Sequence, residues 1–375
     1  MKILIVSTNF SHPTDAGNRA AIMGQVYTLQ KMGHEVHFLF NEMSLRKQDY
    51  SAMQDFWGDK LHIYNQPIYG KFYRLLIDQW RKKVCHGYWK RDDHYPNGLA
   101  KYVNNLQKQH TFDAIIIQYM RLSKLLPAIN IPRKAIYTHD VFAYKDIRTG
   151  GVFYETCDAH QEAKALQRCP NIFAIQEEEA AYYKMISPKS NIFTVYSNYA
   201  FHEQPLTRNK NILFLASRMD FNYNGIKWFL DNVWNKFSTI DPYAKLLIAG
   251  TVCENIKAEE YQNIKLLGRI DSLDEFYKQG DIVINPVYQG TGLKIKTFES
   301  LSYGKITIVH PHSTNGIFQR DKAPLFIAET PDEWIDTLSQ ALSGNIDPFV
   351  NQKKTAQYIS DMSDYITSQY QAFLK

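Results

Sequence analysis

The strongest constraint on the fold is an alternation of apolar runs and amphipathic stretches that stops once and then restarts. Residues 2–8 form a short apolar run, and in the stretch that follows Ile22, Val26 and Leu29 recur at helical spacing. A regular βαβ alternation predicts a mostly parallel sheet covered by helices on both faces. Further strand-like runs of the first half occupy residues 34–40, 112–120, 134–140, 171–176 and 191–198.

The break lies at residues 199–211, which are polar, contain a proline and lack periodicity, as a linker does. The strand-like runs then resume at residues 212–217, 245–250, 264–270, 281–287 and 305–311. We therefore expect an α/β protein with two Rossmann-like, doubly wound domains facing a cleft, over residues 1–200 and 208–350. The last helical stretch, about residues 357–375, is expected to pack back on the first domain. In such folds ligands bind beyond the carboxyl ends of the strands.

Length and composition are those of a soluble two-domain protein. The chain has 375 residues, 45% of them hydrophobic, and no apolar run approaches the roughly 20 residues that span a bilayer. The first residues turn polar too soon for a secretory signal. The four cysteines form no C-x-x-C pair, which indicates reduced thiols in the cytoplasm rather than a zinc site or disulfides. The net charge of +5 does not by itself imply nucleic acid.

The positive charge is concentrated in one segment, Lys71–Arg91. It holds seven Lys or Arg against one Asp, with aromatic residues interleaved. One interpretation is the solvated face of a helix. The other is a surface that meets anionic lipid headgroups or an anionic acceptor, which would make the protein peripheral at the inner face of the cell membrane.

The first strand of the first half ends in a loop that contains Gly17 and Asn18 and leads into a helix. Backbone N–H groups at a helix N-terminus can bind a phosphate or a sugar hydroxyl. The alternative is an ordinary turn capped by Asp15 or Asn18. The loop is not G-x-G-x-x-G, so a nicotinamide or flavin site is not indicated.

His139 and Asp140 follow a later apolar strand of the first half. A lone histidine is more often structural than functional. A His-Asp pair at the carboxyl end of a strand favours a functional role, in which the histidine donates a hydrogen bond to a substrate or carries a proton.

In the second half, Arg218 comes directly after the first strand. The arginine fork matches the oxygen atoms of a diphosphate, and the alternative is a surface ion pair with Asp220. No D-x-D occurs in the chain. A metal-dependent nucleotide-sugar enzyme would be expected to hold Mg²⁺ or Mn²⁺ with such a pair, so we expect side chains and helix ends to neutralise the diphosphate without a metal.

The stretch "NPVYQGTGLKIKTFESLSYGK", Asn285–Lys305, combines glycines, lysines and a glutamate after an apolar strand. With a helix from about Leu293, Lys296, Glu299, Ser300 and Tyr303 share one face, and Ile295, Phe298 and Leu301 point to the core. The N–H groups near Gly292 to Lys294, together with the lysine charge, suit phosphates. A carboxylate one turn further on suits ribose hydroxyls. The pattern predicts a nucleotide-sugar donor.

Three parts of the chain resemble a known family, the retaining family-4 enzymes among the GT-B glycosyltransferases (glycosyl transferases group 1). They are the stretch "NPVYQGTGLKIKTFESLSYGKITIVHP", the preceding "SRMDFNYNGIKWFLDNVW" with "AKLLIAG", and the N-terminal "ILIVSTNF" with its helix. The resemblance is strong in the second half and at the start, and vague between about residues 45 and 130.

The resemblance implies roles for individual residues. Glu299 matches the glutamate that holds the donor ribose, and Arg218 matches the diphosphate arginine. Gly17, next to Asn18, matches a glycine that borders the diphosphate, and His139 resembles the histidine that contacts the donor sugar. The loop and helix start around the donor sugar and phosphates correspond to Gly290, Thr291, Gly292, Leu293, Lys294 and Lys296.

Two positions depart from the family pattern. The usual lysine after the arginine falls at Asn224, for which Lys294 and Lys296 or Lys227 would compensate. The usual acid before the glycine loop falls at Gln289, which suggests a different donor sugar.

The activity implied is a retaining, metal-independent transfer of a sugar from a nucleotide diphosphate sugar, with no cofactor. His139, Asp140, Arg218 and Lys296 are the expected catalytic residues. The expected acceptor is a saccharide or a lipid-linked saccharide of bacterial surface polysaccharide synthesis. Two alternatives stay open: a nucleotide-sugar epimerase of the same fold, and a non-catalytic sugar-nucleotide-binding subunit.

Overall fold

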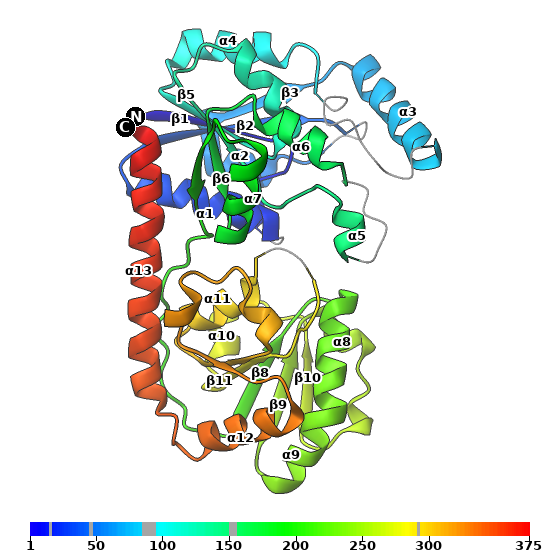
Figure 1. Cartoon of the computed structure of the whole chain (residues 1–375), viewed down its shortest axis with the longest axis vertical. Coiled ribbons are helices and arrows are strands. Elements are labelled where there is room, and N and C mark those ends of the chain that lie inside the picture. The colour runs from blue at the N-terminus through cyan, green and yellow to red at the C-terminus, as the bar shows by residue number, and fades with distance from the viewer. Residues whose placement is uncertain (15–16, 45–47, 85–94, 150–155, 291–292) are drawn as a thin grey trace. The chain divides into compact units, whose positions relative to one another are not determined.

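The computed structural model of the chain is shown in Figure 1, and it describes residues 1–14, 17–44, 48–84, 95–149, 156–290 and 293–375. The chain divides into two compact units. Unit 1 comprises Met1–Asn198 and Asp364–Lys375, and unit 2 comprises Tyr199–Ser363. The long last helix α13 (Pro348–Leu374) therefore contributes residues to both units.

Unit 1 is built on a seven-stranded sheet in which every pairing is parallel, in the order β3-β2-β1-β4-β5-β6-β7. Its central strands are fully buried runs of β-branched and other apolar residues, as expected for a sheet covered on both faces. The strand order reverses between β1 and β4, which is where ligands bind in such sheets. The strands are β1 (Lys2–Ser7), β2 (Glu35–Glu42), β3 (Leu61–Asn65), β4 (Ala114–Gln118), β5 (Arg133–Tyr137), β6 (Asn171–Ala174) and β7 (Asn191–Thr194).

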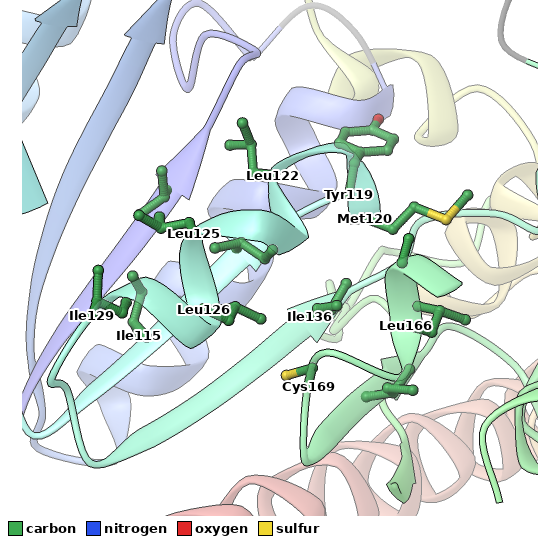
Figure 2. Close-up of a cluster of buried hydrophobic side chains, with 14 of the residues drawn as sticks. Ile115, Tyr119, Met120, Leu122, Leu125, Leu126, Ile129, Ile136, Leu166 and Cys169 are labelled. Carbon is green, nitrogen blue, oxygen red and sulfur yellow. The ribbon is translucent and has the colours of Figure 1, made fainter. Parts of the chain in front are cut away.

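Helices follow the strands of unit 1 as the sequence pattern predicts. Figure 2 shows part of the core, where Leu122, Leu125 and Leu126 of the 3₁₀ helix η3 (Met120–Ala128) pack with Ile115 and Ile136 from the sheet. The α-helices are α1 (Gly17–Lys31), α2 (Ser51–Trp57), α3 (Ile68–Val84), α4 (Leu99–His110), α5 (Lys145–Thr149), α6 (Ala159–Leu166) and α7 (Glu177–Ile186).

Unit 2 repeats this architecture with a six-stranded parallel sheet in the order β10-β9-β8-β11-β12-β13. Its order reverses between β8 and β11, so the loops after these two strands are the expected ligand-binding positions. The strands are β8 (Asn211–Leu215), β9 (Lys245–Ala249), β10 (Ile264–Gly268), β11 (Ile282–Asn285), β12 (Ile306–Val309) and β13 (Leu325–Ile327).

The core of unit 2 fills both faces of its sheet. Trp234 and Trp334 are fully buried on one face, and Phe276 packs on the other. The helix α12 (Pro331–Leu342) is stabilised by a capping box between Thr330 and Glu333. The α-helices are α8 (Asp220–Phe229), α9 (Asn235–Ile240), α10 (Leu273–Tyr277), α11 (Ile295–Ser302) and α12 (Pro331–Leu342), with a π-helical turn at Leu230–Trp234.

Within the part of the chain that the structure describes, no helix has the length and apolar character needed to cross a membrane. Cys157 and Cys169 are buried free thiols and Cys253 is a half-buried one, whereas Cys85 lies outside the described residues.

Candidate functional site

In unit 2 the segment after β11 leads into α11, which starts at Ile295, two residues later than the sequence predicts. Gly290 has a φ of 104°, a left-handed conformation that glycine adopts without a steric penalty. A side chain at Gly290 would contact the Phe221 ring at 3.7 Å. Leu293 is half-buried, and Thr291 and Gly292 lie outside the described residues.

Lys296 is the best-held cation of this segment. Its Nζ donates to Oδ1 of Asn222 at 2.7 Å and lies 5.9 Å from the centre of the Phe221 ring. Asn222 is 1% exposed, and its amide nitrogen donates to the Ser217 carbonyl at 2.9 Å. Burial lowers the pKa of Lys296 to about 8, while the charge of Glu299 opposes this shift and the charge of Lys294 adds to it. The ammonium thus has a neutral partner, so its charge is available to a ligand.

Glu299 lies one helical turn after Lys296. Its Oε1 accepts a hydrogen bond from the hydroxyl of Tyr277 at 2.8 Å. Burial raises the pKa of Glu299, while the Tyr277 bond and the Lys296 charge oppose that rise. The Tyr277 ring stacks on Tyr303 with 4.2 Å between ring centres, which fixes the direction of its hydroxyl. A carboxylate held by a phenol keeps acceptor sites for further donors.

Two residues of α11 lie on a different face from the one predicted. Ser300 is fully buried and bonds with the Thr307 hydroxyl of β12 at 3.0 Å, so it belongs to the core face. Ile295 was expected in the core, but it is 43% exposed because the helix begins at this residue, at the surface of the unit. Phe298 and Leu301 are buried as predicted.

Lys294 turns back onto the loop that precedes it. Its Nζ lies 3.3 Å from the Gly290 carbonyl and 3.2 Å from Nε2 of His312. Nε2 of His312 lies 2.9 Å from the same carbonyl. Burial lowers the pKa of His312, and the Lys294 charge lowers it further. His312 is thus kept neutral and holds the loop at Gly290.

Arg218 follows β8, and both its backbone and its side chain bond to the segment after β9. Its backbone N–H donates to the Thr251 hydroxyl at 3.0 Å, and its guanidinium pairs with Glu254 at 3.3 Å. The surface pair considered for this arginine was with Asp220, but the structure pairs it with Glu254. The guanidinium is 71% exposed, so it can move to a ligand at little cost.

The two residues that depart from the family pattern, and Lys227, differ in their surroundings. Asn224 and Gln289 are exposed. Lys227, the weaker substitute for the missing lysine, is bound to Asp231 at 2.7 Å and to the Tyr261 hydroxyl at 2.7 Å. The cation that contacts Asn222 and Phe221 is Lys296 of α11.

Gly225 lets α8 approach the segment that leads to this site. A Cβ at Gly225 would lie 2.9 Å from Cα of Val287 and 3.1 Å from the Pro286 carbonyl. We expect Gly225→Ala to destabilise unit 2 by about 1–3 kcal/mol, because backbone atoms would have to shift. Gly24→Ala is the matched control, since a Cβ there meets only one atom, at 3.8 Å, and should be neutral or stabilising. Urea unfolding of both variants measures this, and equal stability would contradict the close approach.

In unit 1, His139 is held in an unusual conformation. Its φ is 65°, in the left-handed region that residues other than glycine rarely adopt, and such strain clusters at functional sites. Its ring stacks on Tyr119 with 4.3 Å between centres. Burial, with the Arg121 charge as a second cause, lowers the pKa of His139 to about 3. The ring is therefore neutral at pH 7 and suited to hydrogen bonding rather than to carrying a charge.

A chain of hydrogen bonds fixes the tautomer of His139. Its Nε2 lies 2.6 Å from Oε1 of Gln118, and the Gln118 amide donates to Oε1 of Gln25 at 2.7 Å. The Gln25 amide in turn donates to the Tyr370 hydroxyl on α13 at 3.0 Å. Because the Gln118 oxygen accepts, the proton of His139 lies on Nε2, and Nδ1 is left as an acceptor.

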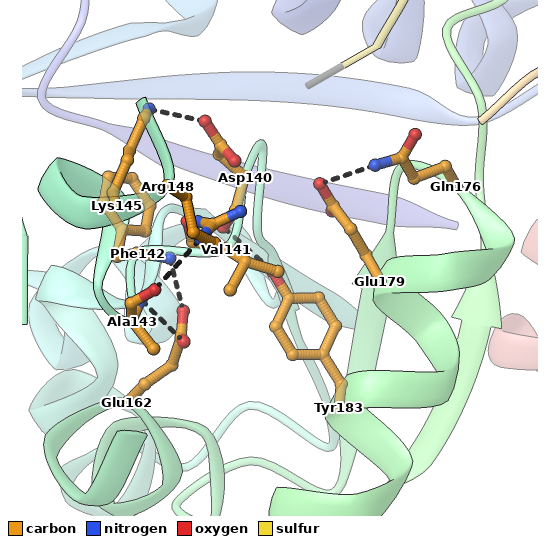
Figure 3. Close-up of polar contacts among 10 residues, drawn as sticks. All are labelled: Asp140, Val141, Phe142, Ala143, Lys145, Arg148, Glu162, Gln176, Glu179 and Tyr183. Atoms are coloured by element: carbon orange, nitrogen blue, oxygen red, sulfur yellow. Dashed lines mark hydrogen bonds and ion pairs between the residues drawn. The ribbon is translucent and has the colours of Figure 1, made fainter. Parts of the chain in front are cut away.

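Asp140 is bound to Lys145 and Tyr183. Its carboxylate pairs with Lys145 at 2.5 Å, and its carbonyl accepts from the Tyr183 hydroxyl at 2.9 Å (Figure 3). The loop that follows is held by the buried carboxylate of Glu162, which accepts the N–H groups of Phe142 and Ala143 at 2.9 and 3.0 Å. The partner of His139 is Gln118.

Gly17 and Asn18 form the start of α1. Gly17 is exposed, and Oδ1 of Asn18 accepts the N–H of Arg19 at 2.9 Å. The two residues before them lie outside the described part of the chain.

Glu179 is a buried acid near Asp140 that no sequence motif indicates. It is 4% exposed, and its Oε1 accepts from the Gln176 amide at 3.1 Å (Figure 3). Burial, with the negative charge of Asp140 as a second cause, raises its pKa to about 8. The folded protein therefore binds a proton between pH 4.5 and 8 that the unfolded chain has released.

That shift predicts the direction of a pH effect on stability. The contribution of Glu179 is fully present below pH 4.5 and is lost as pH rises to about 8. We expect Glu179→Gln to gain stability over the natural chain across this range, on the order of 4 kcal/mol by pH 8. Urea unfolding at pH 5 and pH 8 tests it, with the exposed Glu177→Gln as control. A difference that does not change with pH would rule it out.

Several residues of the two sites were missed by sequence reasoning. Asn222, Phe221 and Tyr277 contact Lys296 or Glu299, and Gln118 contacts His139. Only Gln118 carried a signal, as a polar residue directly at the end of an apolar strand. The others are ordinary helix residues whose roles depend on tertiary contacts.

Comparisons with known proteins relate part of the chain to a family and the whole chain to a fold. Residues 209–344 match the family model described as glycosyl transferases group 1. A Klebsiella pneumoniae protein, described as an uncharacterized 44.6 kDa protein in the cps region, is 24% identical over 330 residues, 80% of each chain. The structure of TarM is similar with a TM-score of 0.70 at 10% identity, over 100% of this chain and 98% of its own. Anabaena HepE in complex with UDP has a TM-score of 0.67 at 11% identity, over 99% of this chain and 98% of its own. Residues 209–344 of unit 2 thus resemble the glycosyl transferases of group 1, and the chain as a whole shares its two-domain α/β fold with TarM and HepE.

Proposed function

We propose that the chain transfers a sugar from a nucleoside diphosphate sugar to an acceptor hydroxyl, with retention of configuration and without a metal ion. The observation that carries the proposal is the pair Lys296 and Glu299 on α11. Each charge is held by a neutral partner, Asn222 and Tyr277, and so stays available to a ligand. An ammonium suits a diphosphate and a carboxylate suits ribose hydroxyls. The complex of HepE with UDP supports a nucleotide of this kind.

The main contribution of the protein to the reaction is electrostatic stabilisation of the leaving diphosphate. As the sugar–phosphate bond breaks, negative charge grows on the leaving diphosphate, and Lys296 and Arg218 stabilise it. The acceptor hydroxyl passes its proton to a phosphate oxygen of the donor as the new glycosidic bond forms on the same face. In unit 1, we assign neutral His139 to the donor sugar, with Nδ1 as the acceptor because its Nε2 is bonded to Gln118, and Asp140, held by Lys145, to the acceptor. Metal independence is proposed because the sequence contains no D-x-D.

The acceptor is proposed to be a saccharide or lipid-linked saccharide of surface polysaccharide synthesis. The relative from the cps region supports this role. The reaction would then take place on the cytoplasmic side, with the protein peripheral at the inner face of the cell membrane.

The direct test is to incubate the full chain with UDP-, GDP- and dTDP-sugars, with and without EDTA, and to follow nucleotide release. We expect release from one donor class, unchanged by EDTA, and a product with the anomeric configuration of the donor. Loss of activity in EDTA would overturn metal independence, and an inverted product would overturn retention. A changed sugar without any acceptor would indicate the epimerase instead. Binding without turnover would indicate the non-catalytic subunit.

A further inference from the structure

The helix α3 of unit 1 presents its apolar side chains to solvent. Among the described residues, 22 large hydrophobic side chains are exposed, and eight of them lie on this 17-residue helix. Five of the eight, spaced four residues apart, form one continuous stripe: Ile68, Phe72, Leu76, Trp80 and Val84. Each is more than half exposed. Apolar surface gathered in this way marks an interaction site rather than the scattered exposure of a normal surface.

The helix is attached to unit 1 by its cationic side. Lys71 is 8% exposed, and its Nζ donates to the Ser44 carbonyl at 2.7 Å. Arg74 donates to the Met43 carbonyl. At 100° per residue, Lys71 and Arg74 lie on the side of the helix opposite Leu76, the middle residue of the stripe. A surface helix of a globular protein normally turns its apolar face to the core, so α3 is oriented the other way round.

We infer that the stripe of α3 is a membrane-docking surface that inserts into the interfacial region of an anionic lipid layer. The charge of the helix fits that partner, since five Lys or Arg stand against one Asp, a net charge of +4. Trp80, Tyr69 and Tyr73 are of the residue types that favour the interface between lipid and water. At 100° per residue Lys83 falls within the stripe, whereas Lys71 and Arg74 lie on the opposite side. A helix of this length with an apolar side and a mainly basic opposite side lies in the plane of the membrane.

The observations favour lipid over a second copy of the chain. A dimer built on this stripe would bring two helices of charge +4 together, whereas an anionic lipid surface neutralises that charge. The sequence predicts a contact between the basic residues and anionic headgroups, and the structure indicates a different main contact. Lys71 and Arg74 already bond to backbone carbonyls, so apolar insertion rather than these charges supplies most of the binding. Residues 85–91 of the predicted segment lie outside the described residues.

The inference rests on the proposed function only in taking the acceptor to be lipid-linked. The test is flotation of the full chain with vesicles of phosphatidylglycerol and phosphatidylcholine, compared with phosphatidylcholine alone. We expect binding to the anionic vesicles that high salt weakens without abolishing. Phe72→Ser with Trp80→Ser should lower the partition coefficient at least about tenfold, because apolar area is removed from the inserted face. Met185→Ser, at a residue of unit 1 that is 79% exposed, is the matched control and should float as the natural chain does.

Three results would overturn the inference. The first is no flotation of the natural chain, and the second is equal flotation of the natural chain and the double variant. The third is light scattering in which the natural chain and Met185→Ser are dimers and the double variant is a monomer. Nucleotide release from a soluble donor is measured on the same preparations. The double variant should retain it, which also shows that the variant is folded. Vesicle binding without turnover of any donor would support the membrane-docking surface and contradict only the proposed reaction.

Discussion

Replacing Glu299 by alanine is expected to lower kcat/KM for the donor by about 10²- to 10³-fold, because hydrogen bonds from ribose hydroxyls to a buried carboxylate are lost. Glu299 is already held in place by Tyr277 in the unliganded chain, so the variant loses a group that needs no rearrangement to bind. Steady-state kinetics with the active donor measures the effect. Glu260→Ala, at a carboxylate paired with Lys257 on the surface of unit 2, should leave kcat/KM unchanged.

Tyr277→Phe distinguishes a positioning role from a merely structural one. The Tyr277 hydroxyl lowers the pKa of Glu299, so its removal should raise that pKa and move the acid limb of donor binding to higher pH. A variant that is less stable but keeps the same acid limb would mean that Tyr277 does not position the carboxylate.

Lys296→Met is expected to lower kcat/KM at pH 7 by about 10²- to 10³-fold, the usual cost of removing one charge-stabilising group. Its pH profile is the more specific result. Burial lowers the pKa of Lys296 to about 8, below its ordinary 10.5, so the ammonium is present at pH 7 and lost as pH rises through 8. For the natural chain kcat/KM should therefore fall above pH 8, by about tenfold per pH unit.

The two substitutions at Lys296 should separate charge from geometry. Lys296→Met should lack the fall above pH 8, and Lys296→Arg should lack it too while retaining more activity, since a guanidinium stays charged. Lys236→Met is the control, because Lys236 pairs with Asp332 at 3.0 Å on the surface of unit 2. An unchanged alkaline limb in Lys296→Met would assign that limb to another group.

The prediction of two doubly wound α/β domains is confirmed, because each half buries its strands in near-continuous apolar runs that are easy to recognise. The local sequence pattern predicts the environment of a side chain less well where that environment depends on a distant segment of the chain. Ser300 was placed on the ligand face, but it bonds to Thr307 of β12. Asn222 gave no signal because its importance comes from a contact with Lys296, 74 positions later.

The segment Lys71–Arg91 also shows that the sequence does not reveal the tertiary contacts of a side chain. Its charges were visible in the sequence, but the bonds of Lys71 and Arg74 to backbone carbonyls were not. Composition alone does not say which face of a helix is turned to the protein. The exposed stripe of α3 is therefore a structural finding rather than a sequence one.

The central claim is that Lys296 and Glu299 bind a nucleoside diphosphate in unit 2. Calorimetric titration of UDP, GDP and dTDP into the natural chain, Lys296→Met and Glu299→Ala tests it most directly. We predict that one nucleotide binds the natural chain, that each variant weakens it at least about tenfold through loss of a charged contact, and that Lys236→Met binds normally. Equal affinity in all four proteins, or no binding of any of the three nucleotides, would contradict the account.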